Sequence, residues 1–222
     1  MATDRLKIYN GALTLCGERS IANLSVNEEG RRLLDEVWDN GGVRYCLEQG
    51  QWRFALRTVR MDYDTDVTPE FGYRRAFRKN DDWVVTSALC SDAYFSQPLL
   101  RYNDEGEYIV ADLDVIYTKY VSDSTDYGND LSRWPQTFTE FVKAYFAWRI
   151  CIKLTGDKER YAMLQAPNSE HMGILPQAKR TALNKDAMRD ASKFPAQGNW
   201  TRARRGTASQ YRDGGNRNTL IG

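Results

Sequence analysis

The spacing of apolar residues changes period twice along this chain, and this change limits the folds open to it. Before Gly50 the apolar residues recur at helical spacing, then short alternating runs follow between turn residues, and helical spacing returns near residue 134. The pattern predicts an α+β protein. We expect a helical bundle from residues 1–50 and 134–194, an inserted small and mostly antiparallel β domain over residues 51–133, and an extended C-terminal arm over residues 195–222.

Two helices are predicted before residue 50. Residues 4–17 have helical character, and Gly17 is expected to end this helix. Residues 25–28 read Ser-Val-Asn-Glu, which has the form of a capping box and predicts a second helix running to about residue 48. Gly41 and Gly42 fall inside this helix, where each costs about 1 kcal/mol, so a kink or a close packing contact is expected there.

The middle third of the chain has the pattern of strands. Residues 52–56 alternate apolar and basic or small side chains, as on a half-buried strand. An apolar run over residues 83–89 and two more over residues 108–111 and 115–121 follow, with a turn-forming Asn-Asp-Glu-Gly at 103–106. Together these runs predict one small antiparallel sheet.

Helices return after this sheet. Residues 137–140 read Thr-Phe-Thr-Glu, a second capping box, and open the most hydrophobic helix of the chain, which Gly156 closes. A shorter helix is expected over residues 157–167 and a last one over about residues 170–193. The last helix has a narrow face of small residues, which suits packing against a neighbouring subunit: Ala178, Ala182, Leu183 and Ala187.

The cysteines and the single histidine offer no reactive site. The four cysteines are far apart in the sequence and include no CxxC pair, so we expect buried free thiols rather than zinc ligands or disulfides: Cys16, Cys46, Cys90 and Cys151. His171 is the only histidine, which excludes any site that needs two, and it is interpreted as a surface or helix-start residue.

No motif for catalysis, cofactor binding or metal binding stands out. The chain lacks a P-loop, a dinucleotide-binding glycine pattern, a nucleophile elbow and an HExxH helix. Asp62, Asp64 and Asp66 alternate, but the glycine and the terminal glutamate of a calcium loop are missing, so a solvated loop is the better interpretation. We therefore expect no catalytic residues, no cofactor and no metal, and the N-terminus has neither a signal peptide nor a membrane-spanning pattern.

The C-terminal tail is locally basic. Residues 198–222 contain five arginines and one aspartate, a net charge of +4, whereas the whole chain has a formal net charge of only +1. A solvated tail and a DNA-binding tail are both compatible with this composition. The interpretation we favour is an arm that orders on a protein partner, with a tryptophan as its anchor. The predicted docking residues are Trp200, Arg202, Arg204, Arg205, Tyr211, Arg212 and Arg217.

This arm is long enough to cross a neighbouring subunit. It spans 28 residues, from 195 to 222. At roughly 3.3 Å for each extended residue, such an arm reaches on the order of 90 Å.

Several weak motifs, taken in their order, resemble the head-to-tail adaptor proteins of tailed bacteriophages, the family also called tail tubular protein A or gatekeeper. The motifs are a helix-to-strand junction of the form G-x-W-x-F, an aromatic and basic strand, two late strands, a central hydrophobic helix and a tryptophan–arginine stretch. They lie at residues 48–54, 71–73, 106–112 with 116–123, 134–156, and 198–206. None is chemically specific alone, and the resemblance covers most of the chain.

The resemblance implies a structural protein of the virion, located at the head–tail junction and assembled in the host cytoplasm. Copies of the family form a closed ring, dodecameric in the family, beneath the portal protein. Their C-terminal arms grip the portal, their sheet domains meet the tail nozzle (tail tubular protein B-like), and viral DNA passes through the ring without sequence-specific binding. No membrane partner is expected. The alternative is a DNA-binding tail- or head-completion protein that uses the basic tail.

Overall fold

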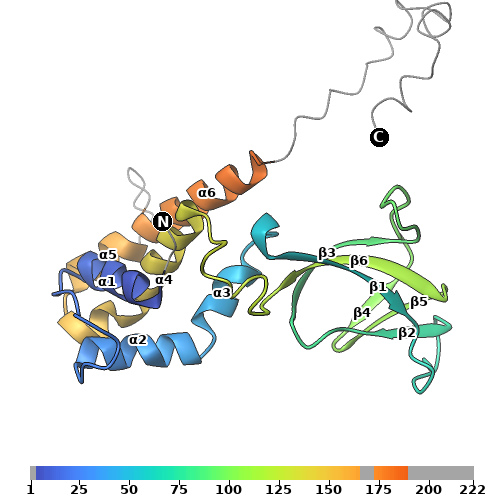
Figure 1. Ribbon diagram of the computed structural model, residues 1–222, viewed down its shortest axis with the longest axis horizontal. Helices are drawn as coiled ribbons and strands as arrows, with labels where there is room; N and C mark the ends of the chain where they lie inside the picture. The colour runs from blue at the N-terminus through green and yellow to red at the C-terminus, as the bar shows by residue number, and fades with distance from the viewer. Residues whose placement is uncertain (1–3, 166–172, 190–222) are drawn as a thin grey trace, which may run out of the picture. The chain divides into compact units, whose positions relative to one another are not determined.

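The computed structural model describes residues 4–165 and 173–189, and these residues form an α+β fold (Figure 1). The helices and strands up to Ala187 belong to one compact unit. The helices are α1 (Arg5–Cys16), α2 (Glu29–Asp39), α3 (Gly42–Glu48), α4 (Gln136–Thr155), α5 (Lys158–Gln165) and α6 (Ile174–Ala187), with a short 3₁₀ helix, η1 (Arg53–Ala55). The strands are β1 (Leu56–Asp62), β2 (Arg75–Arg78), β3 (Trp83–Cys90), β4 (Asn103–Glu105), β5 (Tyr108–Ala111) and β6 (Val115–Ser122).

Helix α4 is the centre of the helical part. Helices α1, α2, α3, α5 and α6 all pack against it. Its length and its many aromatic and aliphatic residues allow it to be buried on several sides, as the sequence predicted. Phe138, Phe141 and Phe146 are fully enclosed, and Phe146 lies edge-on to Trp38 with ring centroids 5.9 Å apart. The helices that precede the strands in the sequence and those that follow them thus share one hydrophobic core.

Two predicted helix ends are confirmed. Gly17 ends α1 in the left-handed conformation, with φ of 77°, and its N–H donates to the carbonyl of Thr14. Gly156 ends α4 in the same way, with φ of 65°, and donates to the carbonyl of Ile152. Glycine adopts this conformation without the Cβ clash that other residues suffer, so it is a reliable stop signal.

Both predicted capping boxes are wrong. The Ser25 hydroxyl donates to the side chain of Asn23 at 2.7 Å, and α2 starts only at Glu29 without a side-chain cap. Helix α4 starts at Gln136, directly after Pro135, so Thr137 is already inside its first turn. In both places a local alternative, an Asn–Ser contact or a proline that presets φ, decides the helix start.

The predicted long helix over residues 28–48 is two helices. Gly41 has φ of 79°, which ends α2 and lets the chain turn into α3. A Cβ at Gly42 would lie 2.6 Å from the carbonyl oxygen of Val37, so this position is also restricted to glycine by close packing. Gly41 therefore separates two helices rather than kinking one, and Gly42 allows the close packing against Val37.

The strands form two antiparallel three-stranded sheets, where one sheet was expected. Their strand orders are β1-β6-β3 and β2-β5-β4. The alternating segment 52–56 was predicted as a strand, but η1 occupies its middle and β1 starts at Leu56. Between the sheets lies a second core that includes Phe77, Ile109 and Tyr120. The strands predicted over 83–89, 108–111 and 115–121 are confirmed within a residue of their ends.

The small-residue face of α6 packs inside the chain instead of facing outward. Ala182 is buried, and Ala178 packs against the same core cluster as α4. Farther along the helix, the Asp186 carboxylate accepts a hydrogen bond from the backbone N–H of Arg53. The chain's own α4 therefore occupies the part of this face around Ala182, whereas Ala187 at its end is exposed.

The structure tests the prediction about the cysteines but not those about His171 and the arm. All four cysteines are buried free thiols, as predicted. His171 and the whole arm over residues 195–222 lie outside the described residues.

Candidate docking surface

The predicted docking residues lie outside the part of the chain that the structure describes. This holds for all seven, which are Trp200, Arg202, Arg204, Arg205, Tyr211, Arg212 and Arg217. The structure therefore neither places them nor brings any of them together. The best-defined candidate surface among the described residues lies elsewhere, on the loops between strands.

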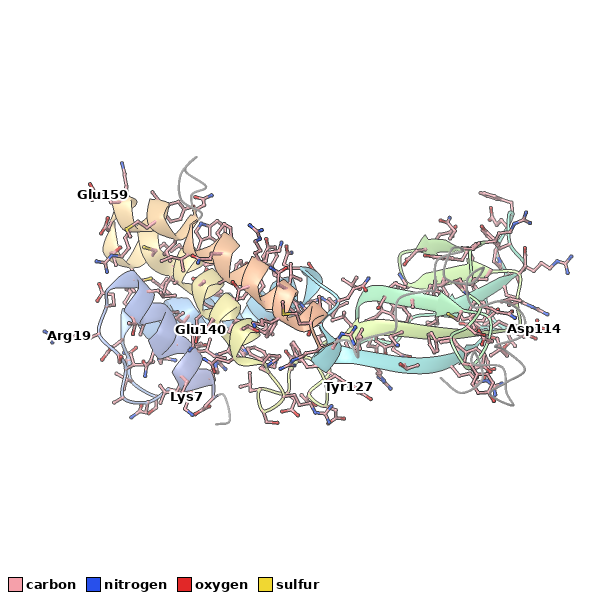
Figure 2. All side chains as sticks on the ribbon, turned by 90° about the horizontal axis from the view of Figure 1, so that it is seen from above. Lys7, Arg19, Asp114, Tyr127, Glu140 and Glu159 are labelled. Carbon is pink, nitrogen blue, oxygen red and sulfur yellow. The ribbon has the colours of Figure 1, made fainter. Side chains whose placement is uncertain are left out.

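Three loops leave one end of the sheet β1-β6-β3. Asp62 ends β1 opposite Val115, which starts β6, and Cys90 ends β3 opposite Tyr117. The segments 63–74, 91–102 and 112–114 consequently meet at this end, and we call them together the loop surface. The backbone N–H of Arg74 donates to the Asp112 carboxylate, which joins the first and third segments. Figure 2 labels Asp114 at this end of the strands.

Large apolar side chains stand out from the loop surface. Phe71 is 87% exposed, Tyr94 is 91% exposed and Leu100 is 86% exposed. Burying an aromatic or leucine side chain is worth about 1.5–3 kcal/mol, so leaving three of them in water forgoes a large stabilisation. Large exposed apolar side chains on the loops at one end of a sheet are candidates for a binding surface. The loop surface thus has the composition of a protein interface.

The segment that carries Tyr94 is a rigid turn. The Asp92 carboxylate accepts hydrogen bonds from the backbone N–H groups of Ser96 and Gln97 and from the Ser96 hydroxyl. These hydrogen bonds lower the pKa of Asp92. Phe95 has a φ of 55°, rare for a non-glycine residue, and the Lys119 ammonium lies 5.0 Å from its ring centre. The turn therefore holds the backbone on either side of Tyr94 in one conformation, which reduces the backbone entropy lost on binding.

The loop surface is acidic. It has six acidic residues and two arginines, a net charge of −4: Asp64, Asp66, Glu70, Asp92, Asp112 and Asp114 against Arg74 and Arg101. At its edge, Arg75 pairs with Asp114 at 2.9 Å and stacks on Tyr63, with the guanidinium carbon 3.9 Å from the ring centre. Such a surface repels phosphates and favours a partner with basic residues around apolar pockets.

At the other end of the same strands, a polar network centred on Asp82 connects them to one another. The Asp82 carboxylate accepts hydrogen bonds from Arg57 at 2.9 Å, from the Tyr120 hydroxyl at 3.0 Å and from the Ser122 hydroxyl. Burial raises the pKa of Asp82, but these hydrogen bonds from Ser122, Arg57 and Tyr120 outweigh it, so the pKa is lowered overall. Burial raises the pKa of Tyr120 to about 12, and its hydroxyl therefore remains a donor.

A single arginine links this network region to α3. Arg44 donates to the Trp83 carbonyl oxygen at 2.8 Å and forms an ion pair with Asp123. Both partners lie at the ends of strands in the sheet that carries the loop surface. The contact therefore holds the strands at a defined place against the helix, and through them the loop surface.

Replacing Asp82 tests this network through its pH dependence. Because the native pKa is lowered, the ionised carboxylate stabilises the fold above the ordinary aspartate pKa of 3.8, and this contribution is lost as the pH falls through the native pKa. We expect Asp82→Asn to lower the free energy of unfolding at neutral pH by about 1–3 kcal/mol. Urea unfolding followed by circular dichroism at neutral and acidic pH measures the difference, which should shrink in acid.

The neighbouring Asp81 supplies the control. It is exposed, so Asp81→Asn should change the unfolding free energy by less than about 0.5 kcal/mol at either pH. If the difference in unfolding free energy between Asp82→Asn and the wild type stayed constant down to acidic pH, the ionised Asp82 carboxylate would not be what stabilises this network.

Among residues 4–165 and 173–189 there is no group of three or more His, Cys, Asp and Glu side chains placed to hold a metal ion. In the same stretch, no helix combines the length and hydrophobicity needed to cross a bilayer.

Neither the family models nor the curated proteins that were compared with this chain match it. The loop surface could have been noticed in the sequence. Tyr94 and Leu100 lie in a segment of turn-forming residues, SDAYFSQPLL, where large apolar side chains have no strand or helix face to join.

Proposed function

We propose that this chain is a structural adaptor of a phage virion, a non-catalytic subunit of a ring that joins the portal to the tail nozzle. The ring surrounds the path of the viral DNA, which passes without sequence-specific binding. The subunit assembles in the host cytoplasm and resides at the head–tail junction of the virion.

The observation that carries this proposal is the loop surface. Three exposed apolar side chains, Phe71, Tyr94 and Leu100, stand at one end of an ordered sheet, one of them on a turn in which three groups donate hydrogen bonds to Asp92. This favours a protein partner over a small substrate, because the three side chains are at least 86% exposed, whereas a small-molecule site encloses its ligand. The order of the sequence motifs supplies the class of partner.

Each part of the chain has a role in the proposal. The helical residues 1–50 and 134–194 make the ring, and residues 51–133 direct the loop surface to the nozzle. The arm over residues 195–222 docks on the portal through Trp200 and its arginines. Residues 1–197 carry a net charge of −3, since the whole chain has +1 and residues 198–222 have +4, and this is compatible with a DNA channel because a weakly acidic wall does not bind phosphates.

Deleting the arm tests the portal contact. A chain that ends at residue 194 should fold normally but no longer attach to its cognate portal, because the arm contributes the anchoring tryptophan and the arginines. Electron microscopy of the mixture should show a ring stacked on the portal for the full chain and free portals for the shortened one.

A shorter deletion is the matched control. Removing residues 218–222 leaves all seven predicted docking residues in place and should preserve the stacked ring. Normal attachment of the chain that ends at residue 194 would refute the role of the arm.

The second candidate, a DNA-binding completion protein, is favoured by the net charge of +4 on residues 198–222. Binding through that tail depends on counterion release and weakens steeply with salt. A gel shift at moderate salt separates the two functions, since an adaptor should leave the DNA unshifted.

A further inference from the structure

Two of the four buried cysteines lie far apart in the sequence but on helices that pack together. Cys16 is the last residue of α1, and Cys151 lies on α4, 135 positions later. Helices α1 and α4 pack against each other (Figure 1). Both side chains are enclosed, with Cys16 only 1% exposed and Cys151 fully buried. Packing in the helical part thus brings together two thiols whose sequence spacing shows no pairing.

The Cys16 thiol reaches the backbone of α4 at the turn that carries Cys151. It donates a hydrogen bond to the Ala147 carbonyl oxygen at 3.4 Å. In an α-helix the carbonyl oxygen of residue 147 also accepts the backbone N–H of residue 151, four positions on. The Cys16 sulfur therefore lies against the same turn of α4 from which the Cys151 side chain extends.

Small residues allow the two helices to approach closely here. Ala12 is one turn before Cys16 on α1, and Ala144 and Ala147 precede Cys151 at helical spacing on α4. All three alanines are buried. A disulfide needs the two Cα atoms to be about 4.4–6.8 Å apart, which helices with bulky side chains between them do not reach. The contact between α1 and α4 therefore has the composition that a disulfide between helices requires.

The environment of Cys16 keeps its thiol unreactive while α1 is closed. Burial, followed by the neighbouring Cys151 thiol, raises the pKa of Cys16 to about 12. Because the thiolate is the nucleophile, a protonated Cys16 does not attack a disulfide at neutral pH. The Arg160 guanidinium opposes this rise in pKa, and it donates to the Cys16 carbonyl oxygen at 2.6 Å. A cation is thus in place to stabilise the Cys16 thiolate once burial is relieved.

Cys16 is better placed than Cys151 to become exposed. It is the terminal residue of α1, and residues 17–20 directly after it are exposed. Helix ends open more readily than the rest of a folded protein. A further turn of α4 follows Cys151, and the Thr155 hydroxyl donates to the Cys151 carbonyl oxygen at 2.8 Å. Opening of the last turn of α1 is therefore the simplest way to free one of the two thiols.

We propose that Cys16 and Cys151 form a disulfide when the protein meets a low-molecular-weight disulfide, and that this bond joins the first helix to the central one. The Cys16 thiolate attacks one sulfur of the small disulfide and releases one small thiol. The Cys151 thiolate then attacks the Cys16 sulfur and releases the second small thiol. In total the two protein thiols lose two electrons and two protons, which convert the small disulfide into two thiols.

This bond would stabilise the fold by restricting the unfolded chain. It closes a segment that includes both sheets, and long closed loops give the largest loss of entropy in the unfolded state. The inference stands without the proposed function. If the chain does belong to a virion, the bond would form after the protein leaves the reducing cytoplasm of the host.

Oxidation of the full-length protein under native conditions tests the proposal. The protein is incubated with excess glutathione disulfide at neutral pH, free thiols are blocked with N-ethylmaleimide, and the unreduced digest is analysed by mass spectrometry. We expect a peptide that links Cys16 to Cys151. The melting temperature measured by circular dichroism should rise by at least about 5 °C and return to its starting value with dithiothreitol.

Alanine variants separate the roles of the two thiols. Cys151→Ala should stop at the mixed disulfide between Cys16 and glutathione, because no second thiol resolves it. Cys16→Ala should leave Cys151 unmodified, because its thiol stays buried. Cys46→Ala removes a buried thiol on α3 and is the matched control, which should still form the bond with the same rise in melting temperature. Each oxidised variant is compared with its own reduced form, so any loss of packing cancels.

Several outcomes would overturn the proposal. One is the absence of the linked peptide from protein that keeps its native circular dichroism spectrum. Another is a bond that forms only in urea, since it would belong to the unfolded chain. A linked peptide without a rise in melting temperature would reject the stabilising role, and loss of the bond in Cys46→Ala would reject the assigned pair. Portal attachment does not enter these measurements, so their result is independent of the test by arm deletion.

Discussion

Trp52→Ala is expected to lower the free energy of unfolding by about 3–5 kcal/mol, the range for removing a large aromatic side chain from a packed core. Trp52 is 1% exposed. Its ring centroid lies 4.8 Å from that of Phe138 and 6.2 Å from that of Phe141, both on α4. Urea unfolding followed by far-UV circular dichroism measures the loss, since the signal does not depend on the removed tryptophan.

The position of Trp52 explains this large effect. It lies between α3 and η1, and its indole N–H donates to the Cys46 carbonyl oxygen at 3.0 Å. The same side chain thus connects the end of a helix, the start of the first sheet and the central helix. Its loss leaves a cavity at the place where these elements meet and removes one of the hydrogen bonds that the Cys46 carbonyl oxygen accepts, the other coming from the backbone N–H of Gln49.

Two further variants separate these contributions. Trp52→Phe keeps most of the ring but removes the N–H, so a smaller loss of about 1–3 kcal/mol is expected. Tyr94→Ala removes an aromatic ring that is 91% exposed, and it should change stability by less than about 0.5 kcal/mol. If Trp52→Ala were no more damaging than Tyr94→Ala, this account of the core would be wrong.

The parts of the fold that could be predicted are those set by local geometry. Gly17 and Gly156 ended the helices where expected, because only glycine adopts the left-handed conformation at no cost. The apolar length of α4 made it recognisable as the central helix. The strands β3, β5 and β6 followed from β-branched and aromatic runs between turns, but β4 (Asn103–Glu105) lies where a turn was expected.

The parts that could not be predicted depend on competing local hydrogen bonds or on contacts between residues far apart in the sequence. Ser25 binds Asn23 in place of capping a helix, and nothing in the four-residue pattern distinguishes these outcomes. The alternation at residues 52–56 fitted a strand, but burial of Trp52 against α4 favours a 3₁₀ turn there. The division into two sheets depends on pairings far apart in sequence, which a local pattern does not contain.

The residues of the candidate site also include some that the sequence indicated and some that it did not. The composition of the basic tail led to the prediction that it is the docking site, and its residues lie outside the described part of the chain. Tyr94 and Leu100 were missed because their exposure depends on where the chain turns after Cys90.

Replacing Phe71, Tyr94 and Leu100 together by alanine should weaken binding to the cognate nozzle protein more than roughly a hundredfold. Central apolar anchors of an interface each contribute about 1–2 kcal/mol or more on truncation, and each factor of ten corresponds to about 1.4 kcal/mol. The fold should be unaffected, since all three side chains are at least 86% exposed. Biolayer interferometry with the purified nozzle protein measures affinity, and urea unfolding checks stability.

Exposed residues of the helical part provide a matched triple control. Arg19→Ala, Lys158→Ala and Gln165→Ala together remove similar side-chain mass from exposed positions and should leave nozzle affinity unchanged. The loop variant should still attach to the portal, because the arm at residues 195–222 is intact. If the loop variant keeps its nozzle affinity, the exposed apolar side chains do not form the nozzle contact. If it loses both the nozzle and the portal contact, the ring itself is damaged. Loss of nozzle binding while portal binding persists is the result expected when the loop surface makes the nozzle contact directly.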